Sequence, residues 1–560
     1  NVSTNGSYGI VAIQGGLMRV DGSSRVDANQ GAALSLEQTE LDMRFESLSS
    51  VEDPNEGIYL KEIGGILQVD GPTTVTNSGK SAIRIIDSSG VIDLGSLAID
   101  NTTSNQNGLH ATGTIASVST TGGTVTTGMG VPILVDGQGT PMPLSVLVES
   151  VSCDGAANGI VLYDATGYFT VSGDGTTPGS GGTLQATVGN TVELMNAKNI
   201  SLNLMNIVDS GQNGIDGTGV EGFALQGCEI TGAGDGLDED AISFDDLNQT
   251  NLMGQVEILN SRISGMAHHG IDIENFSGSV ASLLIQGCTI TDNRTSGFGG
   301  SGVRVRANGT STIAAAQIRD CSFSQLDGAG IIADSGGMSG YIQVAIENNT
   351  LTDIDVNAIL ISPFGNGTGD FSVTGNPEIS KVHTDDAVAI STTAASASVV
   401  FSNNPNVDFD PMVFFGNNAL FVRQDGDGDL EMTVENNQFS NSDLEGIFAT
   451  ARDGLGHLNL LLGGNTVAAP LTAFADGVFV RSQNTNTLCL NLSTADGAGN
   501  NNSTGNSGSG YRTSQQDTSI FNLQGFAGGD SSAVETFIEA NNTGTATGMG
   551  TYGIGDCVTP

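Results

Sequence analysis

The sequence predicts an all-β chain that winds as a solenoid of about 19 coils, and three observations predict it. First, 80 of its 560 residues are glycine, 38% are hydrophobic and 14% are charged. This is too few apolar residues for several bulky cores and too many for disorder. Second, short apolar runs broken by Gly, Asn, Asp, Ser and Thr are typical of short strands and tight turns. Third, one short motif recurs along the chain.

The recurring motif is most often a Gly or Ala followed by an aliphatic residue that opens an alternating strand. Its period averages about 28 residues and drifts with insertions without disappearing, as in solenoid proteins. We expect one residue of each coil to point inward at the same position: Ile10, Leu34, Ile58, Ile83, Leu109, Ile133, Ile160, Val192, Ile215, Ile242, Ile271, Val303, Ile331, Ile359, Val388, Leu420, Ile447, Val478 and Tyr511.

A second strand lies between these positions and bends at a sharp corner. In Leu225–Ile230 and Ile285–Ile290, the alternation of apolar and polar residues is interrupted once between the first and the last apolar residue. This interruption indicates two strands that meet at an angle. Asparagine tolerates the left-handed backbone that a corner needs, and stacked amides hydrogen-bond to one another. We therefore expect a ladder at the corner position, formed by Cys228, Ser261, Cys288, Cys321, Asn349, Asn376, Asn404, Asn437 and Asn465.

The repeat continues without an interdomain linker, so we expect residues 1–560 to form a single solenoid domain. Coils are short over residues 1–190. They are longer over residues 191–493, where they carry the ladder and lateral loops. Residues 494–560 form a closing segment, in which the Gly/Asn/Ser-rich stretch 494–510 is expected to be a flexible excursion.

These repeats resemble the right-handed parallel β-helix of the pectate-lyase-like superfamily, whose coils carry such asparagine ladders. They are more similar to the β-helical repeat regions of very large bacterial cell-surface and adhesin-like proteins. This similarity is carried by the Ile-x-Asn-Asn-x-Leu theme and by Gly15–Gly22, Cys489–Leu492, Glu539–Thr545 and Cys557–Pro560. The resemblance implies a right-handed parallel β-helix over essentially the whole chain and a role in adhesion or scaffolding. The resemblance indicates a location at the cell surface more than it indicates a catalysed reaction, because one fold hosts many functions.

The formal net charge of −44 opposes binding to nucleic acids and to anionic membranes, since both are polyanions. No apolar run approaches the ~18 residues of a spanning helix. The opening Asn1–Gly6 is typical of a turn rather than of a signal peptide, so we expect a segment of something longer. An acidic surface and an even number of cysteines, six, predict an extracellular or cell-surface location.

Two pairs of cysteines are candidates for disulfides. Cys288 and Cys321 occupy the ladder position in successive coils, where a strand spacing of about 4.8 Å lies inside the Cα range of a disulfide. The alternative is that they fill the corner as small residues. Cys489 and Cys557 are candidates for a bridge that closes the C-terminal segment. No Cys-x-x-Cys pair occurs, so a zinc site is not expected.

Residues 235–306 hold the candidates for catalysis, which lie on neighbouring coils: Asp245, Asp246, Asp272, Glu274, Arg304 and Arg306. Carboxylates beside arginines fit a lyase or hydrolase that acts on acidic polysaccharide, with an arginine or a carboxylate as base. The segment is only partly similar to the polygalacturonase pattern. His268–Gly270 lacks the first glycine of its Gly-His-Gly element, and Arg304–Arg306 lacks the lysine of its Arg-x-Lys element. The alternative is that opposite charges on adjacent strands stabilise this face. The sequence favours the structural interpretation.

The segment Asp425–Asp429 is similar to the start of a calcium loop, although Leu430 and Asn436 stand where an EF-hand has glycine and glutamate. As a turn between coils, Asp425, Asp427 and Asp429 are candidate calcium ligands. A solvated acidic turn is the alternative. No phosphate-binding loop or nucleophile motif occurs, so no organic cofactor is expected.

A row of apolar residues in the later coils directly follows the inward residues and therefore points outward. It consists of Ile332, Leu360, Ala389, Phe421, Phe448 and Phe479. In so acidic a chain, the row predicts an assembly face for a second copy or another surface protein. The alternative is that lateral loops cover it as a satellite core. Sugar stacking is disfavoured because the row offers Phe without Trp or Tyr.

The sequence therefore predicts an extracellular structural or adhesive solenoid, as a segment of a larger bacterial surface protein or a subunit of a self-assembling filament or matrix. Two alternatives stay open, a carbohydrate-active lyase or glycoside hydrolase and a phage or secretion-apparatus fibre. Expected partners are further copies, other surface proteins and glycans, without nucleic acid or membrane insertion. Self-association is expected because the first coil, from Ile10, has no covering helix and leaves strand edges open.

Overall fold

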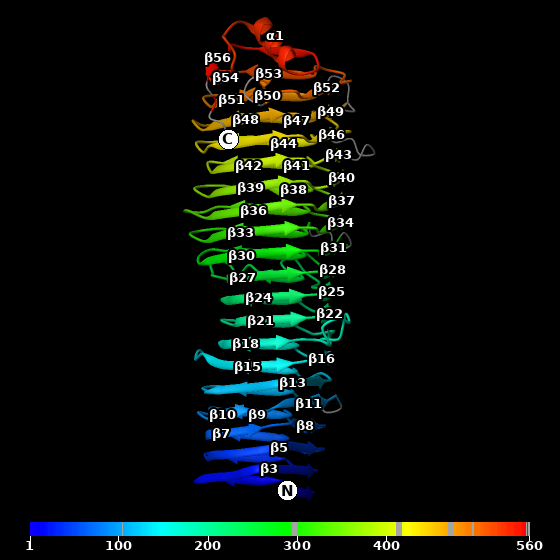
Figure 1. The fold of residues 1–560 in the computed structure, drawn as a ribbon, viewed down its shortest axis with the longest axis vertical. Helices are drawn as coiled ribbons and strands as arrows, with labels where there is room; N and C mark the ends of the chain where they lie inside the picture. The colour runs from blue at the N-terminus through cyan, green and yellow to red at the C-terminus, as the bar shows by residue number, and fades with distance from the viewer. Residues whose placement is uncertain are drawn as a thin grey trace. The chain divides into compact units, whose positions relative to one another are not determined.

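The structure is a computed structural model that describes residues 1–102, 105–293, 299–409, 417–468, 475–494, 498–555 and 557. It divides into two compact units. Unit 1 comprises Asn1–Asp246 with Asn251–Ala267, and unit 2 comprises Leu247–Thr250 with the chain from His268 onward. The fold is an all-β parallel solenoid of about 20 turns, with 57% of the chain in strands and 2% in helix. Figure 1 shows the successive turns within each unit.

A typical turn contributes one strand to each of three parallel sheets. In unit 1, β23 (Ile215–Thr218) belongs to sheet B, β24 (Val220–Gln226) to sheet A and β25 (Glu229–Ala233) to sheet C. The chain then returns to sheet B as β26 (Ile242–Phe244), which pairs with β23. Because hydrogen bonds join strands of successive turns, alternate side chains of every strand stack into a continuous interior.

Sheet B confirms the repeat found in the sequence, because each of the 19 expected residues opens one of its strands. Ile331, Ile359 and Val388, for example, are paired in register and are 0% exposed. A twentieth strand, β55 (Ala546–Met549), pairs Ala546 with Tyr511. The motif missed this strand because small and polar residues replace its aliphatic ones.

The other sheet B strands of unit 1 are β2 (Ile10–Ile13), β4 (Leu34–Glu37), β6 (Ile58–Lys61), β9 (Ile83–Ile86), β12 (Leu109–Thr112), β14 (Ile133–Asp136), β17 (Ile160–Tyr163) and β20 (Val192–Met195). Those of unit 2 are β29 (Ile271–Asn275), β32 (Val303–Ala307), β35 (Ile331–Ser335), β38 (Ile359–Ile361), β41 (Val388–Thr393), β44 (Leu420–Asp425), β47 (Ile447–Arg452), β50 (Val478–Ser482) and β53 (Tyr511–Gln515).

Sheets A and C of unit 1 contain β1 (Val2–Asn5), β3 (Leu17–Asn29), β5 (Glu40–Val51), β7 (Gly64–Val69), β8 (Pro72–Thr76), β10 (Val91–Asp93), β11 (Ser96–Asn101), β13 (Ser117–Thr127), β15 (Met142–Val148), β16 (Ser150–Asp154), β18 (Ala165–Val171), β19 (Thr183–Gln185), β21 (Lys198–Asn203), β22 (Asn206–Ser210), β27 (Leu252–Leu259) and β28 (Arg262–Ser264). The long strand β5 pairs with both β7 and β8, so it runs through both sheet positions.

In unit 2, sheet A contains β30 (Ser279–Gln286), β33 (Thr312–Arg319), β36 (Tyr341–Glu347), β39 (Thr368–Thr374), β42 (Ser396–Ser402), β45 (Leu430–Glu435), β48 (His457–Gly463), β51 (Thr487–Asn491), β54 (Ile520–Gln524) and β56 (Gly553–Gly555). Sheet C contains β31 (Thr289–Thr291), β34 (Ser322–Leu326), β37 (Thr350–Ile354), β40 (Glu378–Val382), β43 (Val407–Phe409), β46 (Gln438–Ser440), β49 (Thr466–Ala468) and β52 (Asn502–Thr504).

The corner between sheets A and C uses two adjacent residues with different tasks. The first has a left-handed backbone, as in Gly227 (φ 61°), Asn348 (φ 55°) and Asn403 (φ 56°), which Gly, Asn and Asp adopt at least cost. The second is the ladder residue. The expectation that the ladder asparagines themselves carry the left-handed backbone is therefore wrong by one position. Their side chains are buried and bond to the next turn, while the preceding residue makes the bend.

The asparagine ladder of unit 2 is confirmed. Asn376 Oδ1 accepts hydrogen bonds from the backbone N and the Nδ2 of Asn349, over 2.9 and 3.3 Å, while Asn376 Nδ2 donates to the carbonyl of Ile346 over 3.1 Å. The same bonds continue from turn to turn through Asn404, Asn437, Asn465, Asn501 and Asn542. Because each amide satisfies its neighbours, these buried polar groups stabilise the interior.

Unit 2 closes with helix α1 (Ser531–Asn541), drawn in red at the top of Figure 1. The Asp530 side chain caps the helix by accepting a bond from the Ala533 amide, and Val534 and Ile538 are 0% exposed. The stretch 494–510, expected to be a flexible excursion, contains β52 and the ladder residue Asn501 within its described part. Of the segment Cys557–Pro560, only Cys557 is described. No helix in the described ranges is long and apolar enough to cross a membrane.

Candidate functional site

The carboxylates and arginines considered for catalysis in unit 2 form ion pairs across sheet B. Asp272 lies opposite Arg304 and Glu274 opposite Arg306, as strand alternation predicts. Arg304 Nε donates to Asp272 Oδ1 over 2.8 Å. Arg306 lies between Glu274 and Asp334, at 3.4 and 2.7 Å. The side chains of Asp272 and Asp334 are 0% and 1% exposed, so these carboxylates are buried, although strand alternation places them on the outer side of sheet B.

His269, which precedes this cluster, accepts a hydrogen bond at Nδ1 from the Ser301 amide over 2.8 Å. Burial, and after it the positive charge of Arg304, lower its pKa to about 2. The imidazole is therefore neutral at physiological pH, and its Nδ1 serves as a buried hydrogen-bond acceptor.

The other two catalytic candidates, Asp245 and Asp246, lie in unit 1 near Asp216. Each accepts a hydrogen bond from a neighbouring hydroxyl group. Burial raises the pKa of Asp216 to about 6, and the carboxylates of Asp246, Glu193 and Asp245 raise it as well. Repulsion within this group of four carboxylates therefore destabilises unit 1 at neutral pH.

We expect Asp216→Asn to stabilise the chain at pH 7 by roughly 1–2 kcal/mol. Because the folded pKa of about 6 exceeds the ordinary Asp value of 3.8, the folded state binds the proton more tightly. Wild-type stability should therefore rise as the pH falls from about 6 to about 4. Urea denaturation at pH 7 and pH 5 measures this gain, which the variant should lose. Asp154→Asn, at an exposed strand residue, is the control. An equal response of both variants would contradict the prediction.

The turn expected to bind calcium gives each carboxylate a different protein partner. Asp425 lies between Arg423 and Arg452, at 3.1 and 2.8 Å. Asp427 accepts from the Leu455 amide over 2.9 Å, and Asp429 faces His457 Nδ1 over 2.8 Å. Calcium prefers oxygens that converge on one point. The carboxylates of Asp425, Asp427 and Asp429 instead bond to separate protein groups. The geometry favours a structural turn, and calcium binding stays a prediction of the sequence.

The cysteine candidates have separate outcomes. Cys489 and Cys557 form a disulfide with a Cα–Cα distance of 5.5 Å. Cys288 and Cys321 are buried thiols that form no disulfide, and the Cys288 amide donates to Cys321 Sγ over 3.4 Å. They occupy the ladder position as thiols, which is the alternative that the sequence left open.

The apolar row forms one column across sheet B, in the register Ile332, Leu360, Ala389, Phe421, Phe448 and Phe479. Its phenylalanine rings stack with centroid distances of 5.7 and 5.3 Å. Guanidinium groups lie over these rings: Arg423 over Phe421, Arg481 over Phe448 and Arg512 over Phe479. We call these three phenylalanines and three arginines the Phe–Arg face. Phe479 is 9% exposed and the other two rings are half-buried.

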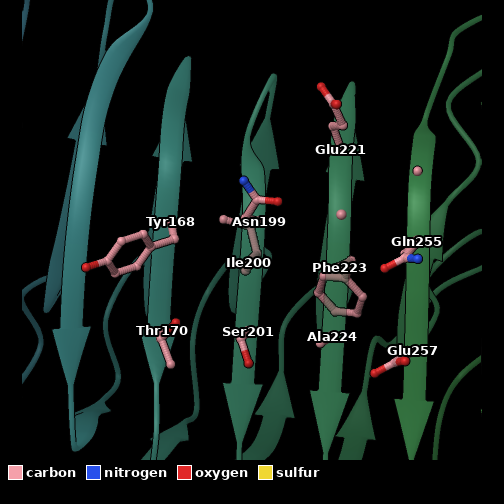
Figure 2. Close-up of a pocket in the computed structure, with 12 residues that line it drawn as sticks. Tyr168, Thr170, Asn199, Ile200, Ser201, Glu221, Phe223, Ala224, Gln255 and Glu257 are labelled. Atoms are coloured by element: carbon pink, nitrogen blue, oxygen red, sulfur yellow. The ribbon is translucent and has the colours of Figure 1, made fainter.

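Sheet A of unit 1 carries an open groove with a volume of about 470 Å³ across β18, β21, β24 and β27. Figure 2 shows its lining side chains on four neighbouring strands. One wall is Tyr168 on β18, whose ring is 46% exposed. The hydroxyl of Ser145 donates to the Tyr168 hydroxyl, which holds the ring toward β15 and over the sheet. We call this hollow the Tyr168 groove.

The floor of the groove is low because two of its outward positions are glycine. Gly222 and Gly254 have φ angles of 80° and 74°, which favour glycine. A Cβ atom on Gly222 would lie 3.1 Å from Asn199 Oδ1. The pairing of β24 with β27 shifts register here, so that one residue of β24 lies opposite two of β27. This β-bulge adds Gln255 to the far wall, and bulges often re-aim side chains at functional sites.

The remaining lining mixes polar and apolar side chains. Thr170, Ser201, Ala224 and Glu257 occupy one register row across the four strands. Glu221 pairs with Lys198 over 2.5 Å. Asn199 donates from Nδ2 to the Gly167 carbonyl over 2.7 Å and leaves the centre of the floor open. The groove thus combines an aromatic face with hydroxyl, amide and carboxylate groups.

A second hollow in unit 2 has a similar first and last strand. It has a volume of about 330 Å³ and crosses β36, β39, β42 and β45. Tyr341 on the first strand is followed in register by Thr368 and Ser396, and Ser398 lies opposite Glu431. Tyrosine on the first strand and glutamate on the fourth therefore occur in both hollows, whereas the third strand offers serines here and Gly222 and Ala224 in the Tyr168 groove.

Sequence analysis did not identify the Tyr168 groove. The sequence pattern that marks the groove is weak. It consists of an outward tyrosine, Tyr168, followed in the next three coils by Asn199, Gly222 and a Gly-Gln pair. In a chain with 80 glycines, this pattern is visible only once strand register is known. No family model matches the chain, and neither the curated proteins nor the solved structures include a match.

Proposed function

We propose that the chain is an extracellular structural and adhesive solenoid, as a segment of a larger bacterial surface protein or a subunit of a self-assembling filament or matrix. The observation that carries this proposal is the continuous asparagine ladder of unit 2. A ladder of buried, mutually satisfied amides makes each turn depend on its neighbours and resists local opening. Such rigidity suits a scaffold that presents a surface. The Cys489–Cys557 disulfide supports an oxidising, extracellular setting.

The ion pairs support a scaffold over an enzyme for acidic polysaccharides. Arg304 and Arg306 are bonded to Asp272, Glu274 and Asp334. A sugar carboxylate would have to displace these buried or half-buried carboxylates before it met a guanidinium group, and an uncompensated buried carboxylate is costly.

Self-association is proposed at the Phe–Arg face. Its half-buried rings offer apolar edges, while Arg423, Arg481 and Arg512 offer positive charge. Because every copy has a net charge of −44, two copies repel at long range, so these arginines would act at short range by pairing with individual carboxylates of the second copy. The proposed contact therefore places apolar area at the centre of the interface and arginine–carboxylate pairs at its edge.

We expect replacement of Phe421, Phe448 and Phe479 by serine to abolish assembly and to lower the melting temperature by only a few degrees. Arg512→Gln should weaken assembly in the same way, because it removes the charge that lies over Phe479 and keeps a hydrogen-bond donor beside the buried Asp476. Sedimentation velocity over a concentration series measures both effects. Arg19→Gln, at a side chain 65% exposed in unit 1, is the matched control. Unchanged assembly in both test variants, or a large loss of stability in the triple variant, would contradict an assembly role for this face.

A further inference from the structure

The Tyr168 groove selects its ligand by charge. Its lining contains two carboxylates, Glu221 and Glu257, and no basic side chain. The adjacent Lys198 is already paired with Glu221. An anionic ligand would meet repulsion without compensation. The charge of the lining therefore disfavours an anionic ligand.

The chemistry of the lining points to a hydroxyl-rich ligand. Carboxylate, amide and hydroxyl oxygens from Glu257, Gln255 and Ser201 accept hydrogen bonds, and the exposed face of Tyr168 suits an apolar C–H surface. A peptide strand is a poor fit, because β18, β21, β24 and β27 are paired internal strands without a free edge for backbone pairing. Buried apolar side chains such as Ile200 and Phe223 form the floor beneath the lining and leave no deep pocket for an apolar anchor.

The dimensions of the groove suit a short linear chain. It crosses four strands, and three strand spacings of about 4.8 Å give a span of about 14 Å. One strand spacing is close to the length of one sugar residue in an extended glycan. Successive sugar rings can therefore meet successive strands and end beside Glu257. The ring at the other end would stack on Tyr168, whose side chain extends from β18 to the side away from Asn199 (Figure 2).

We propose that the Tyr168 groove binds a neutral, extended oligosaccharide, with Tyr168 as the stacking platform and Gln255 and Glu257 as acceptors for sugar hydroxyl groups. The hollow at Tyr341 in unit 2 likewise has a tyrosine on its first strand and a glutamate, Glu431, on its fourth. The inference deepens the proposed function by naming a ligand class for its adhesive role, and it rests on that function.

The test is isothermal titration calorimetry of the full chain with cellohexaose, xylohexaose and mannohexaose, in buffer with and without EDTA. Calorimetry suits a protein that contains no tryptophan. A Tyr341→Ala background isolates the first groove. We expect at least one neutral hexasaccharide to bind, independently of EDTA, and Tyr168→Ala to weaken it at least tenfold. Ala224→Phe, which fills the centre of the floor from an ordinary strand position, should abolish binding. Tyr8→Ala is the matched control, since Tyr8 is 45% exposed.

Three results would overturn the proposal: no binding of any of the three hexasaccharides, equal affinity in wild type and Tyr168→Ala, or binding that requires calcium. Preference for oligogalacturonate over all neutral probes would overturn it too. Circular dichroism of each variant excludes loss of fold as the cause of lost binding. Sedimentation of the Phe–Arg face variants tests the proposed scaffold separately, so failure of glycan binding is distinguishable from failure of the scaffold.

Discussion

Replacement of Asn404 by alanine is expected to lower the free energy of unfolding of unit 2 by about 3–5 kcal/mol. Asn404 Oδ1 accepts from the backbone N and the Nδ2 of Asn376, both over 3.0 Å. Its Nδ2 donates to the Val373 carbonyl and to Asn437 Oδ1. Alanine removes all four bonds and leaves their partners buried, where each unsatisfied group costs on the order of 1–3 kcal/mol.

Guanidinium denaturation followed by circular dichroism measures the loss, and hydrogen exchange locates it. The Asn376 amide, whose acceptor is removed, should exchange at least 100-fold faster. Asn459→Ala is the matched control, because Asn459 is a half-buried strand residue whose side-chain amide donates to the Glu431 carboxylate over 2.6 Å. It should cost less than about 1 kcal/mol. Equal losses in the two variants would show that the ladder has no special energetic role.

Replacement of Arg304 by methionine is expected to cost about 3–5 kcal/mol, because it leaves the carboxylate of Asp272 buried without its cation. Asp272 is 0% exposed, and Arg304 Nε lies 2.8 Å from its Oδ1. Methionine retains much of the apolar length of arginine, so the loss reports the charge rather than a cavity.

The double variant Arg304→Met with Asp272→Asn should recover most of the stability, since it removes the buried charge together with its partner. Arg262→Met is the control. Arg262 also pairs across turns, with Glu229 at 3.5 Å, but both side chains are more than half exposed, and such pairs contribute less than about 1 kcal/mol. Urea denaturation of the four proteins distinguishes a buried ion pair from a surface one. Absence of rescue by the double variant would contradict this account of the pair.

Much of the fold is predictable from the sequence because the solenoid repeats one local pattern. Aliphatic residues such as Ile331 and Ile359 must point inward in every turn, so their spacing gives the strands of sheet B and the outward columns beside them. The ladder asparagines are predictable for the same reason. Asn501 and Asn542 escaped prediction because longer insertions, including helix α1, separate them from Asn465 and from each other.

The features that escaped prediction depend on contacts between turns. Sequence alternation places Phe421, Phe448 and Phe479 on an outer face, but it does not show that Arg423, Arg481 and Arg512 lie over their rings. It likewise does not show that Asp425 lies between two arginines. The Tyr168 groove depends on a β-bulge and two positive φ angles, which exist only once β24 and β27 are paired.

The most direct test of the scaffold proposal is electron microscopy of the purified chain over a rising concentration series. The account predicts ordered assemblies, as filaments or lattices, that disappear in the Phe421, Phe448 and Phe479 serine variant. Single separate particles at every concentration, in wild type as in the variant, would contradict it.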